Sequence, residues 1–359
     1  MRAQVKQIDF TGQDIYAGFD VHSKDWKVTI MAEHMVFKTF SQPPKPEVLF
    51  NYLRNNFPGG NYHTAYEAGF CGYWIHHKLT SFGIDSIVVN PADIPTTNKE
   101  HVQKEDKRDS RKIARSLSSG TLVPIYVPTL QSQIDRSLTR TRSMLVKDLT
   151  RYKNRIKGFL YFYGIPINES FSNAQSHWSN RFMTWLESLE IDKGNGKEAL
   201  NVLISECKNL RTSILKVTKQ IRNLSNTEKY KKDVALLKSV PGIGITTAMT
   251  FLTELESISR FNNIDKLCGY IGLIPSTKSS GEKERTGNIT PRGHSVLRSA
   301  IIESSWVAIR NDPVLMKAYL SYTKRMNSNR AIIKISKKLL NRIRYVLLTQ
   351  KPYECLIQK

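Results

Sequence analysis

One run, HVQKEDKRDSRKIARSL at residues 101–117, places two carboxylates three residues apart among many lysines and arginines. The run contains no glycine or proline and has apolar residues near its end, so it predicts a helix. Residues i and i+3 share a helix face, so Asp106 and Asp109 would point the same way. Carboxylates on one face suit Mg²⁺, which binds oxygen ligands. The alternative is that both acids are solvated charges in a first helical turn, where the helix dipole favours them.

The charge of the chain indicates its kind of partner. Its 359 residues include 54 Lys and Arg against 31 Asp and Glu, which gives a formal net charge of +23. This excess is spread along the chain and is not confined to a tail, so it favours a polyanionic partner, with nucleic acid first. We expect no membrane association, because the sequence has no long apolar run and no lipidation signal.

The cysteines and the N-terminus indicate the compartment. Four cysteines lie far apart without a CxxC pair, which argues against a zinc site and against a secreted disulfide framework. The first residues, MRAQVKQIDFTGQD, lack the apolar core of a signal peptide. We therefore expect a cytoplasmic protein.

Residues 1–125 are predicted to form a mixed α/β domain. We expect strands from Tyr16, at Trp26–Ala32, at 63–69 and at Ser86–Pro91, and helices at Pro46–Phe57, at Tyr73–Ser81 and in the run described above. Asp20 interrupts the first apolar strand, and Glu67 lies at the end of the third.

A carboxylate at the end of a buried strand is costly unless it is paired or bound to metal, so Asp20 is a candidate metal ligand. The alternative is that Asp20 belongs to a hairpin turn with the Ser, Lys and Asp at positions 23–25. His22 is left out of the metal set, because a lone histidine is more often structural or a phosphate contact. Strand ends and an abutting helix can bring acids together. Asp20, Glu67, Asp106 and Asp109 would then form a two-metal site that acts on a phosphodiester.

The order of these acids resembles a known family. Asp, Glu and then Asp-x-x-Asp, with DVHSKDW after the first acid and YEAG at the second, are similar to the N-terminal RuvC-like (RNase H-like) domain of DEDD transposases. These are the insertion-sequence one-ten family, described as bridge-RNA-guided recombinases. The family's acidic quartet falls on Asp20, Glu67, Asp106 and Asp109, and this sequence matches the family's pattern at all four positions. The resemblance implies a DNA recombinase that uses Mg²⁺ and a structured guide RNA.

Residues 126–232 are predicted to be helical. Leu130–Gly164 predicts one long basic helix and Glu198–Tyr230 a second, with a short helix at Trp178–Ile191 and a KGNG turn at Lys193–Gly196 between them. Two long helices joined in this way suggest a coiled-coil arm that dimerises and holds nucleic acid. An ordinary helical bundle with a solvated basic face is the alternative. The resemblance favours the arm, in a homodimer or homotetramer.

Residues 233–359 are predicted to form a mainly α C-terminal domain. In Leu236–Leu255, two apolar helices flank the turn Pro-Gly-Ile-Gly. The backbone amides of Gly242 and Gly244, with the helix dipole, would hold a phosphate in a helix-hairpin-helix element. The alternative is that the turn only separates two packed helices and binds no phosphate.

The segment Pro275–Arg292 is rich in Ser, Gly, Lys and Arg and predicts an exposed loop, followed by a helix from Ser295. GLIPSTKSSGEKERTGNITPRGHSVLR resembles the C-terminal domain of the same transposases, in which a serine before a glycine is the nucleophile. The matching residue is Ser280, with Ser279 beside it as the competitor. The resemblance implies that metal held by the acidic quartet, from the same or another subunit, meets this serine at the scissile phosphate.

A serine hydroxyl needs help to act as a nucleophile. No His–Asp pair is evident near Ser280, although His294 is close in sequence. Arg285, Arg292 and Arg298 are candidate phosphate clamps, with generic basic surface as the alternative. Two more helices are expected after Pro313. The last of these has apolar residues expected in the core: Ile332, Ile333, Ile335, Leu339, Leu340 and Ile343.

We therefore expect a site-specific DNA recombinase of an insertion element, acting through a covalent phosphoserine link. Two alternatives remain open. A RuvC-like nuclease would cut DNA with metal-activated water and leave Ser280 as an ordinary loop residue. A non-catalytic nucleic-acid-binding protein would need neither the serine nor the acids.

Overall fold

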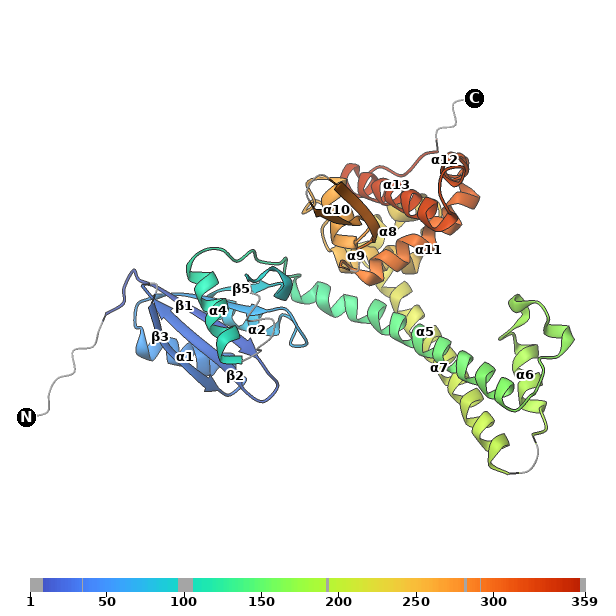
Figure 1. Ribbon diagram of the computed structural model, residues 1–359, viewed down its shortest axis with the longest axis horizontal. Coiled ribbons are helices and arrows are strands. Elements are labelled where there is room, and N and C mark those ends of the chain that lie inside the picture. The colour runs from blue at the N-terminus through green and yellow to red at the C-terminus, as the bar shows by residue number, and fades with distance from the viewer. Residues whose placement is uncertain are drawn as a thin grey trace, which may run out of the picture. The chain divides into compact units, whose positions relative to one another are not determined.

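The computed structural model describes residues 9–33, 35–95, 106–191, 194–280, 283–290 and 292–355 (Figure 1). The side chains of residues 106–107, 277–280 and 283–286 also lie outside this description. The chain forms two compact units, Met1–Leu130 and Gln131–Lys359. The predicted division into three domains stays a prediction.

A five-stranded sheet forms the centre of the N-terminal unit, with strand order β3-β2-β1-β4-β5. Its strands are β1 (Asp14–Val21), β2 (Trp26–Ala32), β3 (Met35–Gln42), β4 (Asn61–Glu67) and β5 (Asp85–Val89). Strand β1 runs antiparallel to β2 and parallel to β4, and β4 is parallel to β5. This mixed sheet and its helices confirm the predicted α/β class of the N-terminal part.

Strand β3 is missing from the sequence prediction. It pairs antiparallel with β2 at one edge of the sheet. Met35 is 70% exposed and Phe37 is 57% exposed, so the strand has no consistently buried face. Sequence periodicity detects a strand by the alternation that burial imposes, and an edge strand of this kind carries little of it.

Helices cover both faces of the sheet. Successive strand residues point to opposite faces. Ile15, Ala17 and Phe19 share a core cluster with residues of α1 (Pro46–Asn56) and α2 (Trp74–Ser81). On the other face, Ala65 and Val89 pack with Ile113 of α4 (Asp106–Ser118). A short 3-10 helix, η1 (Pro91–Asp93), follows β5.

Two long helices dominate the first part of the C-terminal unit and lie side by side (Figure 1). They are α5 (Leu130–Phe162) and α7 (Asn195–Ser225), and between them come η2 (Glu169–Phe171), η3 (Ala174–Ser176) and α6 (Asn180–Ser188). Arg142 Nε of α5 donates to Thr218 Oγ1 of α7 at 2.9 Å. Despite this length, none of the helices described is apolar over a stretch that could cross a membrane.

The predicted helix Glu198–Tyr230 is wrong at its C-terminal end. Helix α7 ends at Ser225, and α8 (Glu228–Ser239) begins after Asn226 and Thr227. The two long helices themselves agree with the sequence prediction, and the coiled-coil character of the pair stays a prediction.

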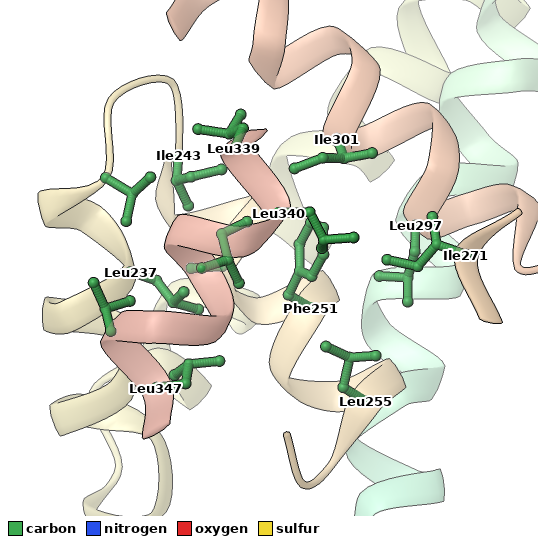
Figure 2. Packing of buried hydrophobic residues seen from close by; sticks show 14 of the residues in the cluster. Leu237, Ile243, Phe251, Leu255, Ile271, Leu297, Ile301, Leu339, Leu340 and Leu347 are labelled. Carbon is green, nitrogen blue, oxygen red and sulfur yellow. The ribbon is translucent and has the colours of Figure 1, made fainter. Parts of the chain in front are cut away.

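The remaining helices surround one hydrophobic core (Figure 2). They are α8, α9 (Ile245–Leu255), α10 (Ile264–Ile271), α11 (Ser295–Asn311), α12 (Pro313–Thr323) and α13 (Ser328–Thr349). Phe251 of α9 and Leu339 and Leu340 of α13 are fully buried there. Burial along α13 confirms the core prediction made for it, with Ile333 only partly buried.

The predicted loop Pro275–Arg292 is instead a β-hairpin. Strand β6 (Pro275–Ser280) pairs antiparallel with β7 (Lys283–Ile289), and we call these two strands the serine hairpin. The loop prediction is wrong because strands are recognised in a sequence by apolar alternation, and this segment has none.

Candidate functional site

Two predicted acids lie at the ends of neighbouring parallel strands. Phe19 of β1 pairs with Tyr66 of β4, so the next residues along the two strands are Asp20 and Glu67. Asp20 shares a face with Gly18, and Glu67 shares a face with Ala65, which packs with α4. The fold therefore brings Asp20 and Glu67 to adjacent positions on the sheet face that α4 covers.

Helix α4 approaches this face closely because residue 18 is glycine. A Cβ atom on Gly18 would lie 2.2 Å from the backbone nitrogen of Ala114 and 2.7 Å from the carbonyl oxygen of Ser110. The Ser110 hydroxyl shares a hydrogen bond of 2.9 Å with that of Thr29, whose backbone is opposite Gly18 on β2. Asp109 directly precedes Ser110 on this helix, and its side chain is half-buried.

This close approach yields a stability prediction. Gly18→Ala should destabilise the N-terminal unit by on the order of 3 kcal/mol, because the added methyl group meets backbone that cannot rotate away. Hydrogen exchange at the amides of β1 and α4 should accelerate accordingly. Gly69→Ala is the matched control, since its Cβ would meet nothing within 4 Å and its φ is ordinary. Equal protection in the two variants would contradict the close packing.

The structure excludes the hairpin-turn alternative for Asp20. The backbone of Asp20 pairs with Lys27 inside the β1–β2 ladder, and the turn begins only at His22, whose amide donates to the Asp25 carbonyl at 3.2 Å. His22 Nε2 lies 3.1 Å from Asp20 Oδ2, and the Asp20 side chain is 20% exposed. His22 was not among the predicted metal ligands, and it lies in the turn just after β1, where its ring contacts the Asp20 carboxylate.

The chemistry of this donor set fits a hard divalent cation, because all four predicted ligands are carboxylates and no thiolate is among them. Within the described residues, no group of three His, Cys, Asp or Glu side chains is placed to hold an ion. The side chain of Asp106, the first residue of α4, lies outside that description. Metal binding by the acidic quartet therefore stays a prediction.

The predicted nucleophile is the last residue of β6. The backbone of Ser280 pairs with Lys283, and that of Ser279 pairs with Glu284. The side chains of both serines, and that of Arg285 on β7, lie outside the described residues. The choice of Ser280 over Ser279 stays a prediction, as does the phosphate role of Arg285.

The residues that flank the serine hairpin, 270–274 before it and 290 and 292–294 after it, are held by close packing and hydrogen bonds, and we call them the hairpin base. Gly272 and Gly293 have φ values of +83° and +114°, and a Cβ on Gly293 would lie 2.6 Å from the Gly272 nitrogen. Arg298 Nη1 donates to the Thr290 carbonyl at 2.7 Å, so this predicted phosphate clamp also ties down the hairpin base. Arg292 is exposed. Phosphate contacts by Arg292 and Arg298 stay predictions.

The two glycines of the Pro-Gly-Ile-Gly turn have different surroundings. Gly242 has a φ of +84°, and a Cβ there would lie 2.3 Å from the Ser304 carbonyl oxygen of α11. Close helix packing and the positive φ therefore explain why residue 242 is a glycine, without any need for a bound phosphate. Gly244 is exposed, precedes α9 and has open space around it. A phosphate contact at either glycine stays a prediction.

A buried acid that was not predicted from the sequence contacts the base of the serine hairpin. The side chain of Glu254 on α9 is fully buried. It accepts hydrogen bonds from Arg140 Nε at 2.7 Å, from Arg140 Nη2 at 2.8 Å and from His294 Nε2 at 3.0 Å. His294 Nδ1 also accepts from the Leu297 amide at 3.3 Å and caps α11. Both ring nitrogens of His294 are thus engaged, so this histidine is not placed to activate the serine.

Burial alone would raise the pKa of Glu254, but hydrogen bonds from His294 and Arg140 lower it from 4.5 to about 2. A depressed folded pKa adds stability that is complete above the unfolded pKa and disappears as pH falls through the folded one. The difference in unfolding free energy between the wild type and Glu254→Gln should therefore be about 3 kcal/mol at pH 7 and shrink between pH 4.5 and 2. Denaturant unfolding followed at α9 by hydrogen exchange tests this, and a pH-independent difference would contradict it.

Two family models match this chain, one in its N-terminal part and one in its C-terminal part. A family model described as "Transposase" of the DEDD type of IS110 matches residues 17–165, and one described as "Transposase IS116/IS110/IS902 family" matches residues 234–320. The first match contains the acidic face described above. The second contains the Pro-Gly-Ile-Gly turn, Glu254 and the serine hairpin.

Individual relatives are distant but match most of the chain. The transposase for insertion sequence element IS1111A of Coxiella burnetii is 25% identical over 299 residues, which cover 80% of this chain and 78% of that protein. The transposase for element IS1533 of Leptospira borgpetersenii is 24% identical over 69% of this chain and 72% of that protein.

Two Sinorhizobium fredii proteins named as transposase candidates, y4qE and y4rJ, are 28% and 29% identical over 67% and 69% of this chain. The chain spans only 57% and 65% of the length of these two proteins. With its N-terminal and C-terminal parts each matched by a model of the same group of proteins, the chain belongs to the IS116/IS110/IS902 family of transposases.

Proposed function

We propose that this chain is a DNA recombinase of an insertion sequence, which cuts and rejoins DNA through a covalent link to Ser280. The observation that carries the proposal is the acidic face of the sheet. Asp20 and Glu67 end neighbouring parallel strands, and Asp109 lies on the helix that Gly18 allows to pack against them. Family membership supports the same conclusion, because DNA cleavage and rejoining are the chemistry of transposition.

The proposed reaction conserves the number of phosphoester bonds. The Ser280 oxygen attacks the scissile phosphorus, loses its proton and forms a phosphoserine ester, while one deoxyribose oxygen leaves as a strand hydroxyl. In the reverse direction, the hydroxyl of another DNA strand attacks the phosphoserine, restores a phosphodiester and releases the serine. The ester retains the energy of the broken bond, so resealing needs no nucleotide cofactor.

Asp20, Glu67, Asp106 and Asp109 are proposed to hold Mg²⁺, as the DEDD family match and the oxygen-only donor set support. When bound, the metal would neutralise negative charge at the reacting phosphate. His22, close to Asp20, would orient that carboxylate through its ring nitrogen. Arg285, Arg292 and Arg298 would contribute further positive charge around the DNA.

Nucleic acid is the proposed partner in two forms. The net charge of +23 fits a long polyanionic surface, and phosphate binding of this kind does not distinguish DNA from RNA. A structured guide RNA that selects the DNA sites is proposed from the family resemblance. Pairing of the α5 and α7 arm between subunits, giving a homodimer or homotetramer, is proposed on the same ground.

An adduct assay separates the proposal from its alternatives. The purified protein with its co-purifying RNA and Mg²⁺ is incubated with end-labelled DNA carrying the insertion-sequence ends, then denatured in detergent and separated on a gel. A labelled band at the position of protein plus DNA supports the serine recombinase. Free cleaved DNA without an adduct indicates hydrolysis by a RuvC-like nuclease. DNA binding without cleavage, at every metal concentration tried, indicates a non-catalytic binding protein.

A further inference from the structure

We infer that Glu254 and His294 are positioning residues for the cleavage step, because they fix the base of the serine hairpin to the long helix α5. This inference rests on the proposed function, which places the nucleophile on that hairpin. The connection consists of direct contacts. Glu254 accepts from Arg140 of α5 and from His294, which directly precedes α11 and follows the hairpin by only a few residues.

On the hairpin side, a series of hydrogen bonds continues this connection from His294 to Ser276. The His294 amide donates to the Tyr270 carbonyl at 2.8 Å, and the Thr290 amide donates to the Ile274 carbonyl at 2.9 Å. The Ser276 hydroxyl then donates to the Asn288 carbonyl at 3.1 Å. A shift of His294 would therefore move the whole base of the hairpin, and with it the strand that ends at Ser280.

Helix α5 carries a second buried acid that does not contact the hairpin base and so offers a matched comparison. Asp135, five residues before Arg140 on α5, accepts from the Tyr230 hydroxyl at 2.6 Å and from Lys229 Nζ at 2.8 Å. Asp135 thus ties α5 to α8, while Glu254 ties α5 to α9 and to the hairpin base. The two acids are similar in burial and in the number of partners, but only Glu254 contacts the hairpin base.

The energetics favour one geometry for Glu254. A buried carboxylate that loses a partner keeps the cost of its desolvation, so positions of His294 away from Glu254 are strongly disfavoured. The two ring nitrogens add a second restraint, because Nε2 donates to Glu254 while Nδ1 caps α11. Since misplacement of a reacting group by about 1 Å can cost on the order of 100-fold in rate, this restraint matters for a nucleophile carried on a hairpin.

The test compares adduct formation with DNA binding in matched variants of the full-length protein with its RNA. Glu254→Gln and His294→Asn should lower the adduct rate at saturating DNA by about 10- to 100-fold and leave the DNA Kd within about twofold. Asn at position 294 can still cap α11, since Asn is a preferred N-cap residue, but is too short to reach Glu254 as His294 does. Asp135→Asn is the control, and it should reduce stability but not the adduct rate.

Hydrogen exchange gives a readout that does not depend on catalysis. In both Glu254→Gln and His294→Asn, the amides of Thr290 and His294 should exchange faster, whereas Asp135→Asn should leave them protected. If the wild type forms no adduct, the proposed function fails, and this exchange experiment still decides whether Glu254 holds the hairpin. Unchanged adduct rates in both variants, or an equal loss in Asp135→Asn, would overturn the inference.

Discussion

Asp109→Asn is expected to lower DNA cleavage by about 10³-fold or more while DNA binding stays within about twofold of the wild type. Asn keeps the shape of the side chain but removes the charge that a divalent cation requires, and metal stabilisation of a phosphoryl transition state contributes several kcal/mol. The same result is expected for Asp20→Asn and Glu67→Gln. Cleavage of labelled DNA, measured over a range of Mg²⁺ concentrations, provides the rates.

Asp25→Asn is the matched control for these variants. Asp25 is also an aspartate of the β1–β2 hairpin, but it lies in the turn, outside the two strands, and pairs with Lys27 at 2.7 Å. It should cleave DNA at the wild-type rate. Full cleavage by Asp20→Asn, Glu67→Gln and Asp109→Asn alike would mean that these acids are only solvated charges.

Ser280→Ala is expected to abolish the protein–DNA adduct, with any remaining signal at the level of a no-enzyme blank. The methyl side chain has no oxygen, so residue 280 can no longer form the phosphoester. DNA binding should persist, because the basic surface is unchanged. The measurement is the fraction of labelled DNA that enters a detergent gel bound to protein.

Ser279→Ala is the control, and it should retain the adduct. The two serines are neighbours on β6, and their backbones pair with adjacent residues of β7. Loss of the adduct in Ser279→Ala alone would assign the nucleophile to Ser279. Retention of DNA cleavage in Ser280→Ala would instead support hydrolysis by water.

The parts of the fold that the sequence predicted are those where burial imposes a pattern. The strand around Phe19 and the long helix α5 both carry apolar residues at regular spacing, and both are present. Strand β3 has no consistently buried face, and the sequence of the serine hairpin shows no apolar alternation, so neither was predicted as a strand. The break at Asn226–Thr227 was missed because apolar spacing continues across it, although Thr227 before Glu228 is typical of a helix start.

The candidate site also contains residues that the sequence predicted and a residue that it did not. Asp20 and Glu67 could be predicted because an acid in an apolar strand is unusual and needs a reason. Glu254 offered a similar signal, a lone acid among the buried residues of α9, but its partners Arg140 and His294 lie 114 and 40 residues away in sequence. Spacing along one element cannot reveal such a cluster, because three separate elements must first pack together.

Mass spectrometry of the trapped complex tests the central claim most directly. The wild-type protein is reacted with DNA, denatured, and digested with protease and nuclease, and the peptides that cover the serine hairpin are sequenced. We predict a nucleotide joined through a phosphoester to Ser280. Cleaved DNA accompanied only by unmodified peptides from this hairpin would contradict the covalent serine mechanism.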